Sequence, residues 1–99
     1  MDARRPTYPL QQIQALVRAG DYRITVTAQR TAAMLDMGRS EIVSCVLGLT
    51  EDDFYKSMPA EAMPGRWQDV YRPSVAELQL YVKLQIDAQR VVVVSFKER

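Results

Sequence analysis

The sequence predicts a single α+β domain in which helices come first and an antiparallel β-sheet follows. Apolar residues recur at helical spacing through residues 10–49, whereas apolar and polar residues alternate from residue 67 onward. A chain of 99 residues, 47% of them hydrophobic, suits one domain, 1–99, with one core. Helices followed by strands indicate a layered fold in which N-terminal helices pack on a sheet.

Three helices are expected in the first half of the chain. The first has Pro9 in its first turn and ends at Gly20, and its inward face comprises Leu10, Ile13, Leu16 and Val17. The second covers 28–36 between a Thr27 cap and Gly38, with Ala33, Met34 and Met37 facing inward. The third is capped by Ser40, and its buried side comprises Ile42, Val43, Cys45, Val46 and Leu49.

Short elements connect these helices to the sheet. Tyr22–Thr25 is rich in β-forming residues and suits a short edge strand. Thr50 and Asp53 have the spacing of a capping box around one helical turn. Residues 59–66 contain two prolines and a glycine and are expected to form a loop.

Three strands are expected in the second half. Trp67–Tyr71 is the first, ending near Pro73. Glu77–Asp87 alternates most clearly, with Leu78, Leu80, Val82, Leu84 and Ile86 on one face and Glu77, Gln79, Tyr81, Lys83, Gln85 and Asp87 on the other. Val91–Lys97 is strongly apolar and is expected to be central in the sheet.

The last hairpin has a predictable register because its polar and apolar faces must match across the turn. A three-residue loop, 88–90, would pair Asp87 with Val91. It would then set Lys83 opposite Ser95 and Tyr81 opposite Lys97. We therefore expect the side chains of Tyr81 and Lys97 to be in contact range.

Composition excludes several classes of protein. One cysteine, Cys45, cannot form an intrachain disulfide, and residues 1–5 do not resemble the start of a signal peptide. No apolar run reaches the roughly 18 residues that a membrane helix needs. We expect a protein of the cytoplasm that does not bind a membrane. The net charge of +1 gives no polycation typical of nucleic-acid binding.

Two short segments, Asp53–Met58 and Trp67–Pro73, are rich in polar side chains that can bind or transfer protons. The chain contains no histidine. The two segments bring Lys, Tyr, Gln and Arg close together. Proton transfer in this protein must therefore use Lys, Tyr or carboxylates, which favours chemistry on a phosphate. The acids Glu51, Asp52 and Asp53 are better explained by helix capping than by a metal site, because no histidine or second acid cluster completes a ligand set.

Together with Gln79–Lys83 and Val94–Glu98, these segments resemble the MqsR (motility quorum-sensing regulator) toxins over nearly the whole chain. The resemblance implies a RelE-like fold and a type II toxin that arrests growth. It implies a ribosome-independent endoribonuclease that cuts mRNA at short GC-containing sequences and needs no metal or other cofactor. It also implies a cognate antitoxin, usually zinc-binding with a helix-turn-helix domain.

The family's functional positions fall on Lys56, Gln68, Tyr81 and Lys97. From the residues alone, each also has a structural explanation: a solvated lysine, a hydrogen bond within the sheet, cross-strand packing and a charge at the chain end. Two further candidates would bind RNA, Tyr55 by stacking a base and Arg72 by holding a phosphate.

Metal-free RNA cleavage needs a base at the ribose 2′-hydroxyl, cations at the phosphate and an acid at the 5′-oxygen. We expect Tyr81 or Lys56 to act as base, Lys97 as acid or phosphate stabiliser, and Gln68 to position the substrate. The main alternative is a non-catalytic RNA- or partner-binding regulatory module with the same fold. A generic partner-binding α+β domain is a third possibility.

Overall fold

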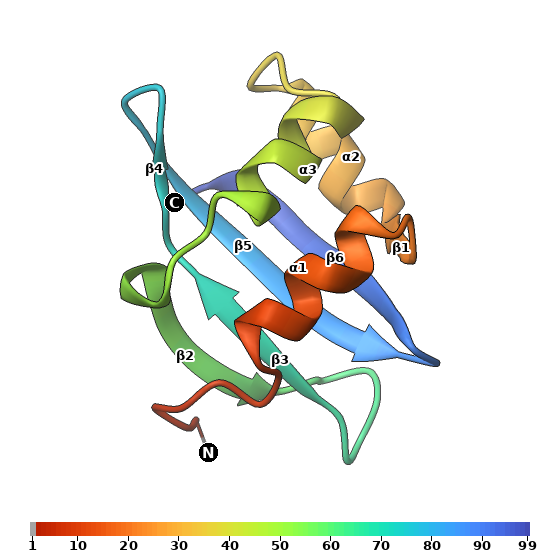
Figure 1. Cartoon of the computed structure of the whole chain (residues 1–99). Helices are drawn as coiled ribbons and strands as arrows, with labels where there is room; N and C mark the ends of the chain where they lie inside the picture. Colours follow the sequence, from red (N-terminus) through yellow and green to blue (C-terminus); the bar gives the residue numbers. More distant parts are fainter. Residues whose placement is uncertain (1) are drawn as a thin grey trace.

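A mixed six-stranded sheet carries three helices on one face, and the computed structural model describes residues 2–99 (Figure 1). The helical elements are α1 (Leu10–Arg18), α2 (Val26–Ala33), α3 (Arg39–Leu47) and the 3-10 turn η1 (Glu51–Asp53). The strands are β1 (Tyr22–Ile24), β2 (Phe54–Pro59), β3 (Trp67–Tyr71), β4 (Ser74–Val75), β5 (Leu78–Asp87) and β6 (Arg90–Glu98). The α+β class is confirmed.

The strand order is β1-β6-β5-β3-β2, with β4 paired to β5 outside this path. β6 is an inner strand between β1 and β5, one position from the centre that was predicted for it, and β1 is an edge strand. One expectation is wrong, because β1 runs parallel to β6 while the other pairs are antiparallel. β1 and β6 come from opposite ends of the chain, so no hairpin fixes the direction of β1.

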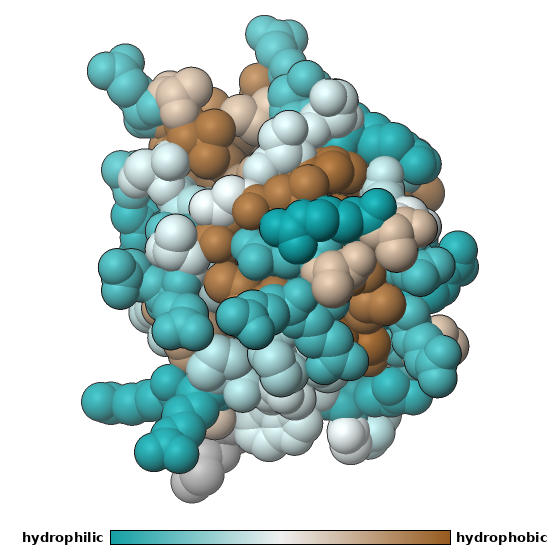
Figure 2. All heavy atoms as spheres, viewed as in Figure 1, coloured by the Kyte–Doolittle hydropathy of each residue, from teal (hydrophilic) through white to brown (hydrophobic). Residues whose placement is uncertain are grey.

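The core lies between the helices and one face of the sheet. Its fully buried members include Ile13 from α1, Ala28 from α2 and Ile42 from α3. The sheet contributes Tyr71, Leu80, Val82, Leu84, Val91, Val93 and Phe96. On the outer side of the helices, hydrophobic side chains reach the surface only in patches that polar residues interrupt (Figure 2). Within residues 2–99, no helix is both long and apolar enough to cross a membrane.

The caps of α2 and α3 differ from the prediction. The N-cap of α2 is Thr25, two residues earlier than expected, and its hydroxyl accepts a hydrogen bond from the Ala28 N–H at 3.1 Å. This shift turns Ala28 and Ala32 inward and leaves Met34 82% exposed. α3 starts after Gly38 instead of Ser40. The Glu41 carboxylate accepts the Gly38 N–H at 2.7 Å and replaces the expected serine cap.

β2 is a strand that the sequence did not predict. It follows η1, where the Asp53 carboxylate accepts the Thr50 N–H at 2.8 Å, as expected of a capping box. β2 then pairs with β3 through a bulge at Tyr55, between the pairs Phe54–Tyr71 and Lys56–Val70. Because of the bulge, Phe54 points into the core while Lys56 points to the opposite face.

The N-terminal segment runs along the outer edge of β2. Ala3 and Ser57 exchange backbone hydrogen bonds of 2.7 and 2.8 Å. The buried Asp69 carboxylate accepts the N–H groups of Thr7 and Tyr8, both at 2.9 Å. A buried carboxylate with two such partners fixes the segment that leads into α1.

The β5–β6 hairpin has the predicted register near its open end but a different turn. Asp87 pairs with Arg90, not Val91, because Ala88 and Gln89 form a two-residue turn with φ of 50° and 62°. A bulge between Lys83 and Leu84 then leaves Val94 unpaired. The extra residue restores the pairs Lys83–Ser95 and Tyr81–Lys97. The Glu77 end of the predicted strand is also corrected, since Ala76 and Glu77 form the β4–β5 turn with φ of 51° and 68°.

Candidate active site on the open face of the sheet

The four predicted site residues share the sheet face opposite the helices, which we call the open face. Directly paired residues point the same way, and the ladders pair Lys56 with Val70, Val70 with Lys83, and Tyr81 with Lys97. Gln68 pairs with Met58 two residues along the same strands. The open face thus carries Lys56, Met58, Gln68, Val70, Tyr81, Lys83, Gln85, Val92, Ser95 and Lys97.

A small apolar floor lies under these polar groups. Val70 and Val92 are 0% and 2% exposed, yet neither belongs to the core cluster that packs on the helices. Val70 lies between Lys56 and Lys83 in the ladders. The methylene stems of two lysines therefore flank a buried valine, with their ammonium groups toward solvent.

Tyr81 is at the centre of the open face. The Nζ atoms of Lys97 and Lys83 lie 5.2 and 5.9 Å from the centre of its ring. Its hydroxyl lies 4.0 Å from Sδ of Met58, so the side chain reaches from β5 over β3 to β2. The expected contact between Tyr81 and Lys97 is confirmed.

Gln68 is held by a neighbour on β5. Its Nε2 donates a 2.9 Å hydrogen bond to Oε1 of Gln85, which is 4% exposed. Because this bond fixes the amide plane, Gln68 presents a defined edge to the open face. That suits the positioning role expected of it.

Lys56 is paired with the N-terminal segment. Its Nζ lies 2.9 Å from Oδ2 of Asp2, and the two side chains are 29% and 47% exposed. The hydrogen bond that Lys56 donates to the Asp2 carboxylate raises the pKa of Lys56, and the same contact lowers the pKa of Asp2. Lys56 is thereby held as an ammonium ion, which favours a role at the phosphate over a role as base.

Tyr55 and Arg72 form a stacked pair beside this site. The Arg72 guanidinium carbon lies 4.3 Å from the centre of the Tyr55 ring, and Lys56 Nζ lies 5.5 Å from it. Tyr55 is the bulge residue of β2 and is 48% exposed. An exposed aromatic ring with a cation on it suits a single-stranded nucleic acid, whose bases stack and whose phosphates need cations.

Lys83 was not among the predicted site residues. Burial lowers the pKa of Lys83 first, and the nearby charge of Lys97 lowers it further. The sequence held one signal for it, since Lys83 is two residues from Tyr81 on the polar side of an alternating strand. That signal is shared by Gln79, Gln85 and Asp87, so alternation alone could not select Lys83.

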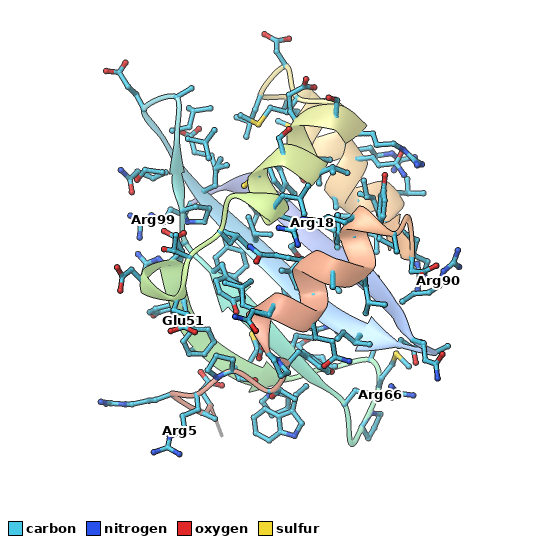
Figure 3. The ribbon with its side chains drawn as sticks, in the orientation of Figure 1. Arg5, Arg18, Glu51, Arg66, Arg90 and Arg99 are labelled. Carbon is cyan, nitrogen blue, oxygen red and sulfur yellow. The ribbon has the colours of Figure 1, made fainter. Side chains whose placement is uncertain are left out.

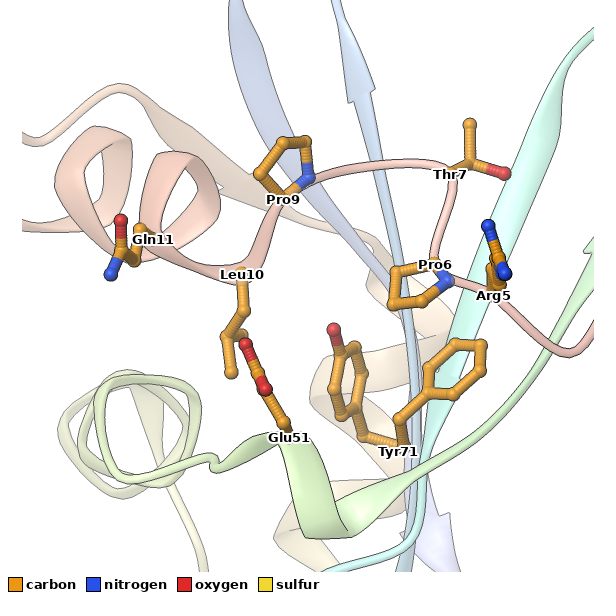
Figure 4. Close-up of a pocket in the computed structure, with 9 residues that line it drawn as sticks. Arg5, Pro6, Thr7, Pro9, Leu10, Gln11, Glu51 and Tyr71 are labelled. Carbon is orange, nitrogen blue, oxygen red and sulfur yellow. The ribbon is translucent and has the colours of Figure 1, made fainter.

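The open face is a surface and not a deep pocket. A cavity of about 570 Å³ lies instead on the helix side of β2, between Arg5, Leu10, Glu51 and Tyr71 (Figure 4). Burial raises the pKa of Tyr71 there to about 12, so it stays a neutral phenol. A second hollow of about 590 Å³ at the β2 edge includes Asp2, Arg4, Tyr55 and Lys56. Neither contains Gln68, Tyr81 or Lys97, so the candidate site is marked by clustered polar side chains and not by the depth of a hollow.

Cys45 and the acidic side chains are the remaining groups with the chemistry of a nucleophile or a metal ligand. Burial raises the pKa of the Cys45 thiol to about 11, which agrees with an inert core position. Across residues 2–99, no three His, Cys, Asp or Glu side chains gather in a way that could hold a metal ion.

Comparison with known proteins identifies the family. The family described as "Motility quorum-sensing regulator, toxin of MqsA" matches residues 5–98. This chain belongs to the MqsR toxin family. It is also 39% identical to the mRNA interferase toxin MqsR of Escherichia coli (strain K12), over the full length of both chains. The predicted family is confirmed, and with it the prediction of a toxin enzyme, whereas the roles of individual MqsR-family residues stay predictions.

Proposed function

We propose that this chain is an endoribonuclease that cleaves mRNA, with Lys56, Gln68, Tyr81 and Lys97 as its active site. The observation that carries the proposal is their convergence on one sheet face from four different strands, in a member of the MqsR toxin family. The named relative is an mRNA interferase. A surface site suits a long polymer, which must lie across the protein.

In the cleavage step, the phosphorus atom would exchange its bond to the 5′-oxygen for a bond to the neighbouring 2′-oxygen. The 2′-hydroxyl loses its proton and bonds to phosphorus, the P–O5′ bond breaks, and the 5′-oxygen takes up a proton. The products are a 2′,3′-cyclic phosphate and a 5′-hydroxyl. This sequence needs two proton transfers and stabilisation of negative charge, and no redox partner.

The geometry supports a division of roles. Tyr81 is the preferred base, because Asp2 holds Lys56 in its charged form. Lys97 lies beside Tyr81 and Lys56 lies on the same face from β2, and both would stabilise charge on the phosphate. Gln68 would position the substrate, and Tyr55 with Arg72 would bind the adjoining nucleotides.

Finer features of the proposal rest on the resemblance to the MqsR toxins. We propose that cleavage needs neither a metal nor the ribosome and occurs at short GC-containing sequences. The protein cations of the open face supply charge that a metal supplies in other nucleases. The family description names MqsA, and we propose a cognate antitoxin, zinc-binding with a helix-turn-helix domain. We propose a cytoplasmic location, since the proposed substrate is mRNA.

A digest of a defined RNA by the purified protein tests the function. We expect cleavage in the presence of EDTA and without ribosomes, with a 2′,3′-cyclic phosphate at each mapped 3′ end. Lys56→Ala, Tyr81→Phe and Lys97→Ala should each remove the activity while the circular dichroism spectrum is unchanged. No cleavage by the wild type would favour the non-catalytic binding module, and cleavage lost only with EDTA would point to a metal enzyme.

A further inference from the structure

The lysines of this chain are distributed unlike its arginines. The sequence contains three lysines, Lys56, Lys83 and Lys97, and ten arginines. All three lysines point to the open face around Tyr81. The arginines labelled in Figure 3, by contrast, are spread around the molecule: Arg5, Arg18, Arg66, Arg90 and Arg99.

Lysine and arginine differ in their ability to exchange protons, and this difference bears on the role of the open face. Arginine is protonated at every working pH, so it supplies charge without exchanging protons. Lysine can lose its proton, and burial or neighbouring cations make it a stronger acid. All three lysines, whose side chains can exchange a proton, thus lie on one face of the sheet, while Arg72 lies beside them as a fixed charge.

Lys83 is the lysine with the most distinctive surroundings. It is half-buried on the central strand β5, and its ladder partners are Val70 on β3 and Ser95 on β6. Within residues 2–99 the ion pairs are Lys56–Asp2 and Arg66–Asp87, so Lys83 has none.

The charged and titratable groups that act on Lys83 come from several elements. Lys56 on β2 and Lys97 on β6 disfavour its charge, and only Glu61 of the 60–66 loop favours it. The Tyr81 ring lies 5.9 Å from its Nζ on the same strand, and β3 contributes the uncharged Val70. The Lys83 ammonium ion is therefore poorly compensated in the free protein.

We propose that Lys83 is a further catalytic residue, the general acid that gives its proton to the 5′-oxygen as the RNA strand breaks. This role rests on the proposed function and completes it. As the 2′-oxygen bonds to phosphorus, the electron pair of the breaking P–O5′ bond goes to the 5′-oxygen. That oxygen takes a proton from the Lys83 ammonium, which becomes a neutral amine. The proton removed from the 2′-hydroxyl goes to Tyr81 in its phenolate form, which becomes a phenol. Return of one proton from Tyr81 to the Lys83 amine through solvent restores the starting state.

The other two lysines fit this role less well. Lys56 has a carboxylate partner that makes it a weaker acid. Lys97 is exposed at the end of β6 and suits a contact with a phosphate oxygen. Burial and the charge of Lys97 lower the pKa of Lys83, so it releases its proton more readily than an ordinary lysine, as a general acid should.

A leaving-group substitution tests the proposal directly. The substrate is a short oligonucleotide with one ribonucleotide at the mapped cleavage site, in which the leaving 5′-oxygen is either retained or replaced by sulfur. A thiolate leaves without protonation, so an enzyme that lacks its general acid cuts the sulfur substrate normally. The variants are Lys83→Met, which keeps the length of the side chain, and Lys83→Arg, which keeps the charge.

We expect both variants to cut the oxygen substrate about 10²- to 10⁴-fold more slowly than the wild type. On the sulfur substrate, both should match the wild type within a few-fold. Lys97→Met is the matched control and should stay slow on both substrates, because it removes a phosphate contact.

Two results would overturn the role of Lys83. One is a wild-type rate for Lys83→Arg on the oxygen substrate, since charge alone would then suffice. The other is an equal deficit of both variants on both substrates, which would indicate damage to the fold or to phosphate binding. Failure of the proposed function looks different, because the wild type itself would then leave the oxygen substrate uncut.

Discussion

Tyr81 and Lys97 stand directly opposite each other across the β5–β6 ladder, with the lysine Nζ 5.2 Å from the centre of the tyrosine ring. A lysine over an aromatic ring contributes little to stability at an exposed site, on the order of 0.5–1 kcal/mol. Substitutions in this pair should therefore change activity with little effect on the free energy of unfolding.

Replacing Tyr81 by phenylalanine should reduce RNA cleavage about 10²-fold or more, because it removes the proposed proton-exchanging hydroxyl. Its melting temperature should be unchanged, since the hydroxyl's contact within the protein is a 4.0 Å approach to Met58 Sδ. Tyr8→Phe is the matched control, because the Tyr8 hydroxyl donates a 2.7 Å hydrogen bond to the Trp67 carbonyl. That variant should lose about 1 kcal/mol of stability and keep its activity. The opposite pattern would remove Tyr81 from the site.

Asp2→Asn should release Lys56 for the substrate. The pKa of Lys56 is raised by Asp2, so it falls toward its ordinary value of 10.5 in the variant, and Lys56 remains an ammonium ion at neutral pH. We expect a lower KM for RNA with little change in kcat, measured in steady-state cleavage assays at low salt. Asp52→Asn removes a charge from η1 without touching Lys56 and serves as the control. A KM that does not fall would mean that the Asp2 contact does not compete with RNA.

Lys83→Met should leave the protein at least as stable as the wild type at neutral pH. Burial and neighbouring cations lower the pKa of Lys83 in the folded state below 10.5, the value for a free lysine. Between these two values the unfolded chain binds more protons, so the free energy of unfolding contributed by Lys83 rises with pH. Urea titrations near neutral pH and near pH 10 check this. The free energy of unfolding of the wild type should rise relative to that of the variant as the pH rises. A variant that is much less stable at neutral pH would contradict an uncompensated charge at Lys83.

Tyr55→Ala should weaken RNA binding about 10- to 100-fold, if the exposed ring stacks one base. Filter binding to an RNA with 2′-O-methyl riboses, which cannot be cut, measures this without interference from cleavage. Tyr22 offers a matched control, because Arg39 lies 5.7 Å from its ring in a similar cation–π pair at the β1 edge. Tyr22→Ala should bind RNA as the wild type does. Equal losses in both variants would indicate that the Tyr55–Arg72 pair is not a specific contact.

Periodicity and caps predicted much of the fold because they depend on neighbours in sequence. The α1 face, the Thr50–Asp53 capping box and the limits of β3 follow from local spacing. β2 and the direction of β1 depend on partners far along the chain, so local patterns could not define them. Thr25 shows the same limit, since its hydroxyl caps α2 while donating to the Val94 carbonyl of β6.

The sequence predicted those site residues whose position follows from matching the polar faces of two paired strands. It did not predict Lys83, whose distinctive property is its burial. The Tyr81–Lys97 pair follows from alternation along β5 and β6. Lys83 looked like any polar strand residue, because its half-burial comes from Val70 on a different strand and its repulsion from Lys56 and Lys97. The contact of Lys56 with Asp2 joins the chain's start to β2 and had no signature in the sequence.

The unpaired Val94 switches the alternation of inward and outward side chains along β6. Before it, Val91 and Val93 face the helices; after it, Phe96 does, and Ser95 and Lys97 turn outward. Removing that one residue would invert the second half of the strand, driving a lysine inward and a phenylalanine out. Hairpin length and the geometry of the candidate site are thus coupled, and any relative with a shorter or longer β5–β6 turn must adjust the bulge to keep a lysine beside this tyrosine.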